Sequence, residues 1–195
     1  DPEHDLFTLE QIRRFEQMSS QLSKALGATF RQHILNSAGI ERFPDAQYDM
    51  VRLGIGLHGI GEDSSLRVVS SFKTTISQVS SVDAGETVGY LRSGYTKQPS
   101  IIATIPVGYA DGFHRSLGNG TGKVYVNGQL APTIGEICMD MAMIDVTGLD
   151  VAEGDVVELF GKHQSVAELA RQAGTIPYEI LTSVPERVKR VYLQE

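Results

Sequence analysis

Polar residues next to glycines are the groups in this 195-residue chain whose types and spacing could carry chemistry. Glycine allows tight bends and close approach of the backbone to a ligand, so a neighbouring polar side chain can be presented at the end of a strand. Several of these positions could meet at one site. They are Ser37, Arg52 with Gly54-Ile55-Gly56, Gly89-Tyr90, Gly108-Tyr109-Ala110-Asp111-Gly112 and Cys138-Met139-Asp140.

Ser37 and the backbone amides around Gly54 and Ile55 could form an anion site. In barrels of parallel strands, the loops after the last two strands often hold a phosphate group with hydroxyls and unpaired N–H groups. A turn serine and ordinary loop glycines would give the same pattern, so the sequence leaves both interpretations open. Arg52 likewise either pairs with a structural carboxylate or presents its guanidinium to a ligand.

Two tyrosines could take part in proton transfer or binding. Tyr90 can act as a general base only where a nearby cation or donor favours its phenolate, and the residues alone favour a tyrosine packed through its ring with its hydroxyl in water. Tyr109 lies in the dense segment IPVGYADGFHR, where Asp111 can stabilise a turn through its own backbone. In the segment CMDM, Cys138 and Met139 also fit an ordinary buried strand.

Other catalytic patterns do not occur in the sequence. Gly54-Ile55-Gly56 lacks the third glycine of a dinucleotide fingerprint, and no GxSxG nucleophile motif is found. The histidines show no short metal-binding spacing, so we expect no metal site. They stand at positions 4, 33, 58, 114 and 163.

Composition narrows the class of protein. The 17 basic and 24 acidic residues leave a net charge of −7, which argues against a nucleic-acid partner. The single cysteine excludes an internal disulfide and favours a reducing compartment, so we expect a cytoplasmic protein. The longest nearly apolar stretch, Ser100 to Ala110, is about half of the roughly 20 residues that cross a bilayer, so we expect no membrane segment.

The first 60 residues follow the rhythm of a βα-repeat. Thr8 and Gln11 form a candidate capping box, and apolar residues at helical spacing up to Gly27 predict a helix over about 8–26. The stretches 28–37 and 48–59 predict two strands with a short helical piece between them. A complete eight-fold barrel needs roughly 250 residues, so this region could form only the last part of one.

From about Leu66 the sequence predicts a mostly antiparallel β region, with the domain boundary between His58 and Ser65. Asn127-Gly128 is the strongest hairpin signal, because a type I′ turn needs positive φ at both central residues. A capping pair formed by Ser165 and Glu168 predicts a short helix that ends near Gly174. A further helical piece at 177–183 and a closing strand at 187–193 complete the expected elements.

Three segments, taken together in their order and spacing, resemble the C-terminal half of alanine racemases. They are NSAGIERFPDAQYDMVRLGIGLHG, IPVGYADGFHR and IGEICMDMAMIDVT. The resemblance covers essentially the whole chain. It implies that residues 1–60 are the last units of a (β/α)8 barrel that binds pyridoxal phosphate, and that residues 61–195 form the C-terminal β domain. The implied activity is interconversion of L-alanine and D-alanine for cell-wall peptidoglycan.

The resemblance also implies a role for each candidate residue. Tyr90 would be the general base on the L-alanine face, acting in the site of the opposite subunit of a homodimer. The backbone of Met139 would contact the substrate carboxylate, with Asp140 beside it. The cofactor phosphate would be bound by Ser37, Gly54, Ile55 and the hydroxyl of Tyr109. Arg52 would contact the pyridine nitrogen of the cofactor, and His33 would orient the guanidinium of Arg52.

These residue types suit racemisation. The reaction needs two bases on opposite faces of a planar carbanion, whose charge the cofactor disperses. An arginine at the ring nitrogen keeps its own protons and does not protonate that nitrogen. The cofactor ring therefore draws less charge from the carbanion than it would with a carboxylate partner. Simple return of the proton should therefore be favoured over competing reactions.

Two departures from the family pattern limit what this chain could do alone. The second base in the family is a lysine that binds the cofactor, in a segment like KANAYGHG, which is absent here. Glu186 stands where the family usually has a tyrosine. We therefore expect a C-terminal portion of a longer racemase that is inactive alone. No lysine of this chain matches the family segment, neither Lys24 nor Lys73, Lys97, Lys123, Lys162 or Lys189.

Two alternatives stay open at this point. A racemase of the same family could act on serine or on a broader set of amino acids, because residues outside this chain shape much of the pocket. A non-catalytic β module used for dimerisation or docking would also lack the lysine.

Overall fold

The computed structural model describes residues 2–63 and 65–193, which divide into two compact units. Unit 1 comprises residues 1–69 and unit 2 residues 70–195. Each unit is described here by its own contacts. Within the described residues, no helix is long and apolar enough to cross a membrane.

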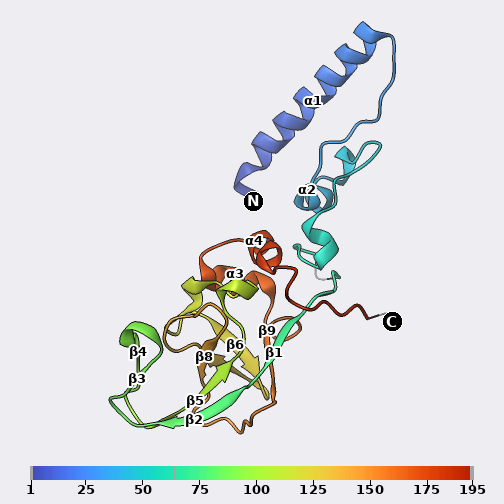
Figure 1. The fold of residues 1–195 in the computed structure, drawn as a ribbon. Helices are drawn as coiled ribbons and strands as arrows, with labels where there is room; N and C mark the ends of the chain where they lie inside the picture. The colour runs from blue at the N-terminus through green and yellow to red at the C-terminus, as the bar shows by residue number, and fades with distance from the viewer. Residues whose placement is uncertain (1, 64, 194–195) are drawn as a thin grey trace. The chain divides into compact units, whose positions relative to one another are not determined.

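Unit 1 is built on one long helix, α1 (Asp5–Leu26), which follows a short 3-10 turn at Pro2–His4 (Figure 1). The helix begins at Asp5, three residues before the predicted cap. Thr8 lies inside the helix, where its hydroxyl donates to the His4 carbonyl and does not cap the helix. Its end is as predicted, since Gly27 adopts the left-handed conformation with φ of 62°. The shorter elements are α2 (Ser37–Arg42) and 3-10 turns at Pro44–Ala46 and Ile55–His58.

The two strands expected over 28–37 and 48–59 are wrong as regular strands. Two backbone hydrogen bonds nevertheless join the two segments, from the Asp49 N–H to the Gln32 carbonyl at 3.2 Å and from the Arg52 N–H to the Leu35 carbonyl at 3.0 Å. Donor and acceptor advance together along the chain, so the segments run parallel. Parallel strands are stable when neighbours pair with them on both sides. Within the described residues of unit 1, each segment has a single neighbour.

Unit 2 contains nine strands within its described residues, and every pairing between them is antiparallel. One sheet has the order β1-β9-β6-β7, a second β2-β5-β8, and a third is the two-stranded ribbon β3-β4. The antiparallel β domain is therefore confirmed. The strands are β1 (Phe72–Thr75), β2 (Gln78–Val82), β3 (Thr87–Val88), β4 (Gly94–Tyr95), β5 (Ser100–Ile105), β6 (Lys123–Val126), β7 (Gln129–Pro132), β8 (Ala142–Asp145) and β9 (Val156–Phe160).

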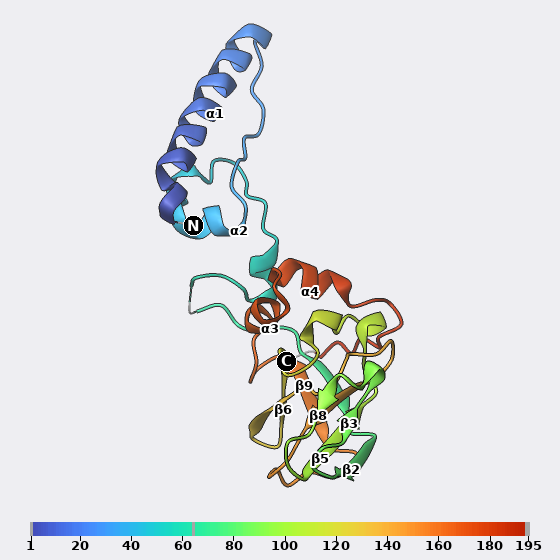
Figure 2. The same ribbon diagram turned by 90° about the vertical axis from the view of Figure 1, so that its left-hand side faces the viewer.

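Local turn and cap signals in unit 2 are confirmed. Asn127 and Gly128 join β6 to β7 with φ of 44° and 91°, as a type I′ turn requires. The Ser165 hydroxyl accepts the Glu168 N–H and begins α3 (Val166–Ala173), which ends at the left-handed Gly174. Helix α4 (Pro177–Ser183) follows, and both views show it beside α3 at one end of unit 2 (Figure 1, Figure 2).

The closing strand expected at 187–193 is wrong. This segment pairs with no strand of the described chain, and the Arg190 guanidinium instead donates to the carbonyls of Val184, Pro185 and Val188. A strand exists only where a sheet edge accepts it. The apolar core lies between the sheets and α3, and its largest fully buried side chains include Ile105, Phe113, Leu117, Ile144 and Leu169.

Candidate active site

Ser37 organises the first cluster of predicted residues, in unit 1. It is 5% exposed and begins α2, where the Asn36 side chain accepts the Gly39 N–H. The Ser37 hydroxyl oxygen accepts the N–H groups of Gly54 at 2.9 Å and of Gly56 at 3.2 Å. Because these two bonds occupy its lone pairs, the hydroxyl proton is left to donate to an anion. The Ile55 N–H donates to no other residue of the described chain, whereas that of Gly54 is already engaged.

Arg52 and His33 form the second predicted pair of unit 1. One guanidinium nitrogen of Arg52 lies 3.0 Å from His33 Nδ1, and the other donates to the Ile34 carbonyl at 2.9 Å. A guanidinium only donates, so Nδ1 must be the acceptor and the ring proton must sit on Nε2. The carbonyl and the imidazole thus fix the plane of the guanidinium, while its Nε has no partner among the described residues.

In unit 2, the loop at Tyr109 and the loop at Met139 form one rigid platform. The Tyr109 N–H donates to the Cys138 carbonyl and the Ala110 N–H to the Met139 carbonyl, both at 3.0 Å. Gly108 permits this approach, because a Cβ there would lie 2.3 Å from both carbonyl oxygens. The Met139 side chain is 55% exposed, and its backbone N–H has no acceptor within the described residues.

Arg187 joins these two loops through carboxylates that the sequence analysis did not connect. It contacts Asp111 with Nε at 2.9 Å and Asp140 with Nη2 at 2.7 Å. The other carboxylate oxygen of Asp111 accepts the Gly108 N–H at 3.0 Å. The hydrogen bond to Asp140, followed by that to Asp111, raises the pKa of Arg187 above its ordinary value. The basic run RVKR after α4 was the available signal, but it does not show which carboxylates it meets.

Tyr90 lies at the tip of the β3-β4 ribbon, in the turn between the two strands. Its side chain is 72% exposed, and its hydroxyl contacts no described residue of the chain. Contacts between glycines hold the ribbon next to its turn. Gly94 pairs with Val88 beside the turn, and a Cβ on Gly94 would lie 2.7 Å from the Gly135 N. Gly135 itself has φ of 72°. The backbone is therefore closely packed near Tyr90, while Tyr90 itself stays exposed.

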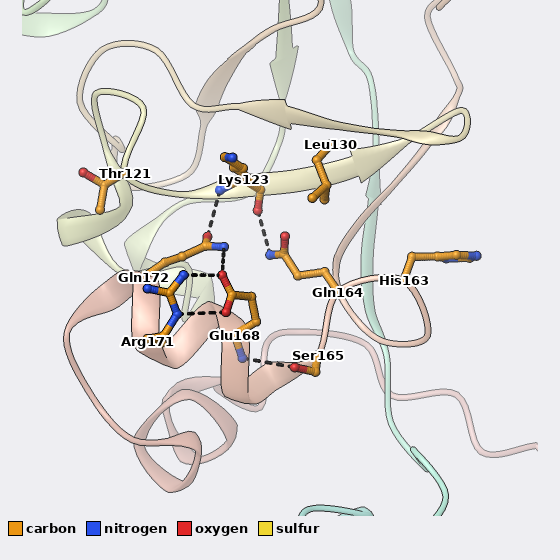
Figure 3. Close-up of a pocket in the computed structure, with 9 residues that line it drawn as sticks. All are labelled: Thr121, Lys123, Leu130, His163, Gln164, Ser165, Glu168, Arg171 and Gln172. Atoms are coloured by element: carbon orange, nitrogen blue, oxygen red, sulfur yellow. Dashed lines mark hydrogen bonds and ion pairs between the residues drawn. The ribbon is translucent and has the colours of Figure 1, made fainter. Parts of the chain in front are cut away.

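A groove in unit 2 is lined by residues other than those of these clusters. It measures about 410 Å³ and lies between the β6-β7 hairpin and the start of α3 (Figure 3). Gln164 lines it, and its amide nitrogen donates to the carbonyls of Lys123 and Leu159. The Glu168 carboxylate there is engaged by Arg171 and Gln172. None of the site residues predicted from sequence lines this groove.

The structure therefore gathers the predicted residues into separate sets. His33 with Arg52, and Ser37 with Gly54 and Ile55, lie within unit 1. Tyr109, Met139 and Asp140 meet within unit 2, together with the additional residues Asp111 and Arg187. Glu186 is exposed on the same segment as Arg187.

Comparison with known proteins places both units in one family. The family model described as "Alanine racemase, N-terminal domain" matches residues 1–62, and "Alanine racemase, C-terminal domain" matches residues 69–192. Among curated relatives, alanine racemase of Clostridium tetani is 41% identical over 84% of this chain and 46% of its own length. That of Desulfosudis oleivorans is 38% identical over 93% of this chain and 50% of its length.

Solved structures agree. Alanine racemase of Bartonella henselae with covalently bound pyridoxal phosphate superposes with a TM-score of 0.88 at 39% identity, covering 95% of this chain and 52% of that one. The Clostridium difficile 630 alanine racemase in complex with cycloserine gives 0.86 at 35% identity, covering 96% and 52%. The chain thus spans about half the length of the relatives it matches.

Proposed function

The chain belongs to the alanine racemase family, and we propose that it supplies the C-terminal portion of a pyridoxal-phosphate-dependent racemase that interconverts L-alanine and D-alanine. The observation that carries the proposal is the match of both family domains, in order, to a chain that keeps the polar clusters described above. The boundary proposed between the barrel part and the β domain is residue 60. The proposed setting is the cytoplasm, where the product would serve cell-wall peptidoglycan.

The cluster in unit 1 has the donors that the cofactor needs. Ser37 has a free hydroxyl proton and Ile55 a free N–H, which together suit a phosphate group. Arg52, oriented by His33, has an unused Nε for the pyridine nitrogen. The proposed phosphate ligands also include the Tyr109 hydroxyl and Gly54, whose N–H would have to leave the Ser37 hydroxyl to donate to the phosphate. The cofactor, when bound, supplies the π-system that disperses the charge of the substrate carbanion.

Tyr90 is the proposed general base for the L-alanine face. Its exposure and its lack of a partner in this chain support a role in the site of a second subunit, so the proposed assembly is a homodimer. The free N–H of Met139 is proposed to bind the substrate carboxylate, with Asp140 beside it. The opposite face needs a lysine that this chain does not supply in the family's segment.

The isolated chain tests the cofactor part of the proposal. It should bind pyridoxal phosphate weakly, with a visible absorbance change, and borohydride reduction should leave no stoichiometric adduct on its lysines. The Arg52→Gln and Ser37→Ala variants should weaken the binding, while the Arg190→Gln variant serves as control. A stoichiometric lysine adduct in the wild-type chain would contradict the proposal that the attachment lysine lies outside it.

A completed enzyme tests the activity. The chain would be joined to the N-terminal remainder of the Clostridium tetani relative and assayed with alanine and with serine. A clear preference for alanine is expected, and comparable rates with serine would favour a racemase of broader specificity. Inactivity with both, in a folded dimer that binds pyridoxal phosphate, would favour a non-catalytic β module.

The same enzyme tests Tyr90. Because the equilibrium constant of racemisation is one, net rates in the two directions must fall together, so the face of each base is measured by exchange of the α-proton in D2O. Tyr90→Phe should abolish exchange from L-alanine and largely preserve exchange from D-alanine. Equal loss from both enantiomers would contradict the assignment to one face.

A further inference from the structure

We propose that Arg187 is a positioning residue for the carboxylate subsite, holding the Tyr109 and Met139 loops together and balancing the two aspartates beside that subsite. The inference rests on the proposed function, in which the Met139 N–H binds the substrate carboxylate. Its structural half concerns contacts within unit 2 and can be judged without any racemase activity.

Arg187 is connected to both loops by hydrogen bonds. Asp111 accepts the Gly108 N–H on one oxygen and Arg187 on the other, so the guanidinium is tied to the backbone that begins the Tyr109 loop. Its second arm reaches Asp140, the residue next to Met139. A planar guanidinium with several donors can bridge two carboxylates in a fixed geometry, which a lysine ammonium does poorly.

The contact between the end of α4 and the Tyr109 loop places Arg187. At the end of α4, a Cβ on Gly112 would lie 2.9 Å from the Ser183 carbonyl oxygen. The Ser183 hydroxyl lies 2.8 Å from the Ile180 carbonyl oxygen, its shorter contact, and 3.3 Å from that of Gly112. This close contact holds the start of the 184–193 segment against the end of the Tyr109 loop. Arg187, four residues beyond Ser183, is thereby delivered to the two aspartates.

Arg187 also balances the negative charge of two aspartates. Asp111 and Asp140 are two carboxylates beside the N–H that is proposed to bind a third, the carboxylate of the substrate. Arg187 is the cation that contacts both of them. Without it, the subsite would repel the substrate carboxylate and Asp140 would lose its ion pair, so both the shape and the charge of the site depend on this residue.

Amide hydrogen exchange of the 195-residue chain tests the structural half. In Arg187→Gln, exchange of the Tyr109 and Ala110 amides should rise roughly three- to tenfold, because they donate across the two loops and two exposed ion pairs are lost. Amides of the paired strands β5 and β8 should be unchanged. Lys189→Gln, which removes an exposed cation of the same segment, should behave as wild type.

Acetate, as the carboxylate probe, tests the functional half through the NMR signal of the Met139 amide. The wild-type chain should show a saturable shift, Arg187→Gln should bind acetate several-fold more weakly, and Arg187→Lys should recover part of the affinity by restoring the charge. A purely structural role would give no such rescue, because lysine does not restore the fork.

The outcomes separate the two claims. Wild-type exchange at Tyr109 and Ala110 in Arg187→Gln would overturn the clamp, and so would a uniform rise across the β5 and β8 amides. If Met139 does not respond to acetate in the wild-type chain, the carboxylate role of Met139 in the proposed function is wrong and Arg187 serves no subsite, while the exchange result still decides the clamp.

Discussion

Unit 1 and unit 2 differ in how many of their own apolar side chains they bury. In unit 2, side chains from several strands and from α3 are fully buried, whereas α1 of unit 1 leaves Leu6, Phe7 and Leu26 largely exposed. The described part of unit 1 buries only three apolar side chains, Leu35, Ala46 and Ile55. Antiparallel hairpins bring their partners from nearby in the chain, while parallel segments depend on distant ones.

Removing one phenylalanine from each unit tests this difference in burial. Phe113 is fully buried in unit 2, and Phe113→Ala should lower the free energy of unfolding of that unit by about 3–5 kcal/mol. Phe7 is 65% exposed on α1, and Phe7→Ala should change stability by under about 0.5 kcal/mol. Urea unfolding followed by NMR signals from each unit measures both. Equal losses would show that α1 buries Phe7 in solution.

Gly135 and Gly27 both have a left-handed backbone conformation, but they differ in the space around them. A Cβ on Gly135 would lie 2.7 Å from the Val88 carbonyl oxygen, so Gly135→Ala should cost about 2–4 kcal/mol and displace the Tyr90 ribbon. A Cβ on Gly27 would meet nothing within 4 Å, so Gly27→Ala should cost about 1 kcal/mol from conformation alone. Similar costs measured by urea unfolding would mean that the ribbon is free to shift away from Gly135.

The same contrast explains what the sequence could predict. The hairpin and α3 were predictable, because turns and helix caps depend only on residues that are close in the sequence. The residues concerned are Asn127 and Gly128 for the hairpin, and Ser165, Glu168 and Gly174 for α3. The strands expected in unit 1 and at 187–193 failed because a strand needs a partner that local pattern does not specify. Thr8 failed for another reason, since a hydroxyl inside a helix can bond backwards as readily as it can cap.

The candidate site follows the same division. Residues in glycine-rich segments such as GYADG and CMD were conspicuous in the sequence, and the structure brings Tyr109 together with Met139. Arg187 was missed, because its partners Asp111 and Asp140 are distant in sequence and only the folded chain brings them together. The hydrogen bond from the Gly54 N–H to the Ser37 hydroxyl could not be predicted either, because the two residues are distant in sequence. This bond leaves the Ile55 N–H as the free amide.

A smaller effect is expected from Tyr48, which ties a turn of unit 1 to α1. Its hydroxyl donates to Glu16 at 2.9 Å, and its ring lies 5.4 Å from that of Phe15. Burial, with the bond to Glu16, raises the pKa of Tyr48 to about 12. Because this lies above the unfolded value of about 10, the contact should be intact below pH 10 and lost as pH rises through 12.

Nuclear Overhauser contacts between Phe15 and Tyr48 measure this loss, and unit 2 provides the reference. Tyr48→Phe keeps the ring contact but has no proton to lose, so its contacts should persist over the same range. If the variant loses the contacts at the same pH as wild type, the alkaline step belongs to another group of unit 1.

The smallest effect concerns one glutamate in each unit with the same local chemistry. The Arg13 hydrogen bond lowers the pKa of Glu10 in α1 to about 2, and the Arg171 hydrogen bond does the same for Glu168 in α3. Folded values below the unfolded one of about 4.3 mean that both contributions are present above that pH and are lost as pH falls through 2. NMR titration of the two carboxylates should therefore give similar curves.

The consequences of that titration should nevertheless differ between the helices. Helix α3 buries Val166, Leu169 and Ala170 and keeps its Ser165 cap, whereas α1 has only Ser19 as a buried residue among those described. Acid should therefore fray α1 measurably, seen as faster amide exchange around Glu10, while α3 stays ordered because packing holds it. Glu10→Gln and Glu168→Gln should each abolish the step in their own helix. Equal fraying of both helices in the wild-type chain would mean that packing in unit 2 does not protect α3. The difference in burial between the two units would then not explain the stability of their helices.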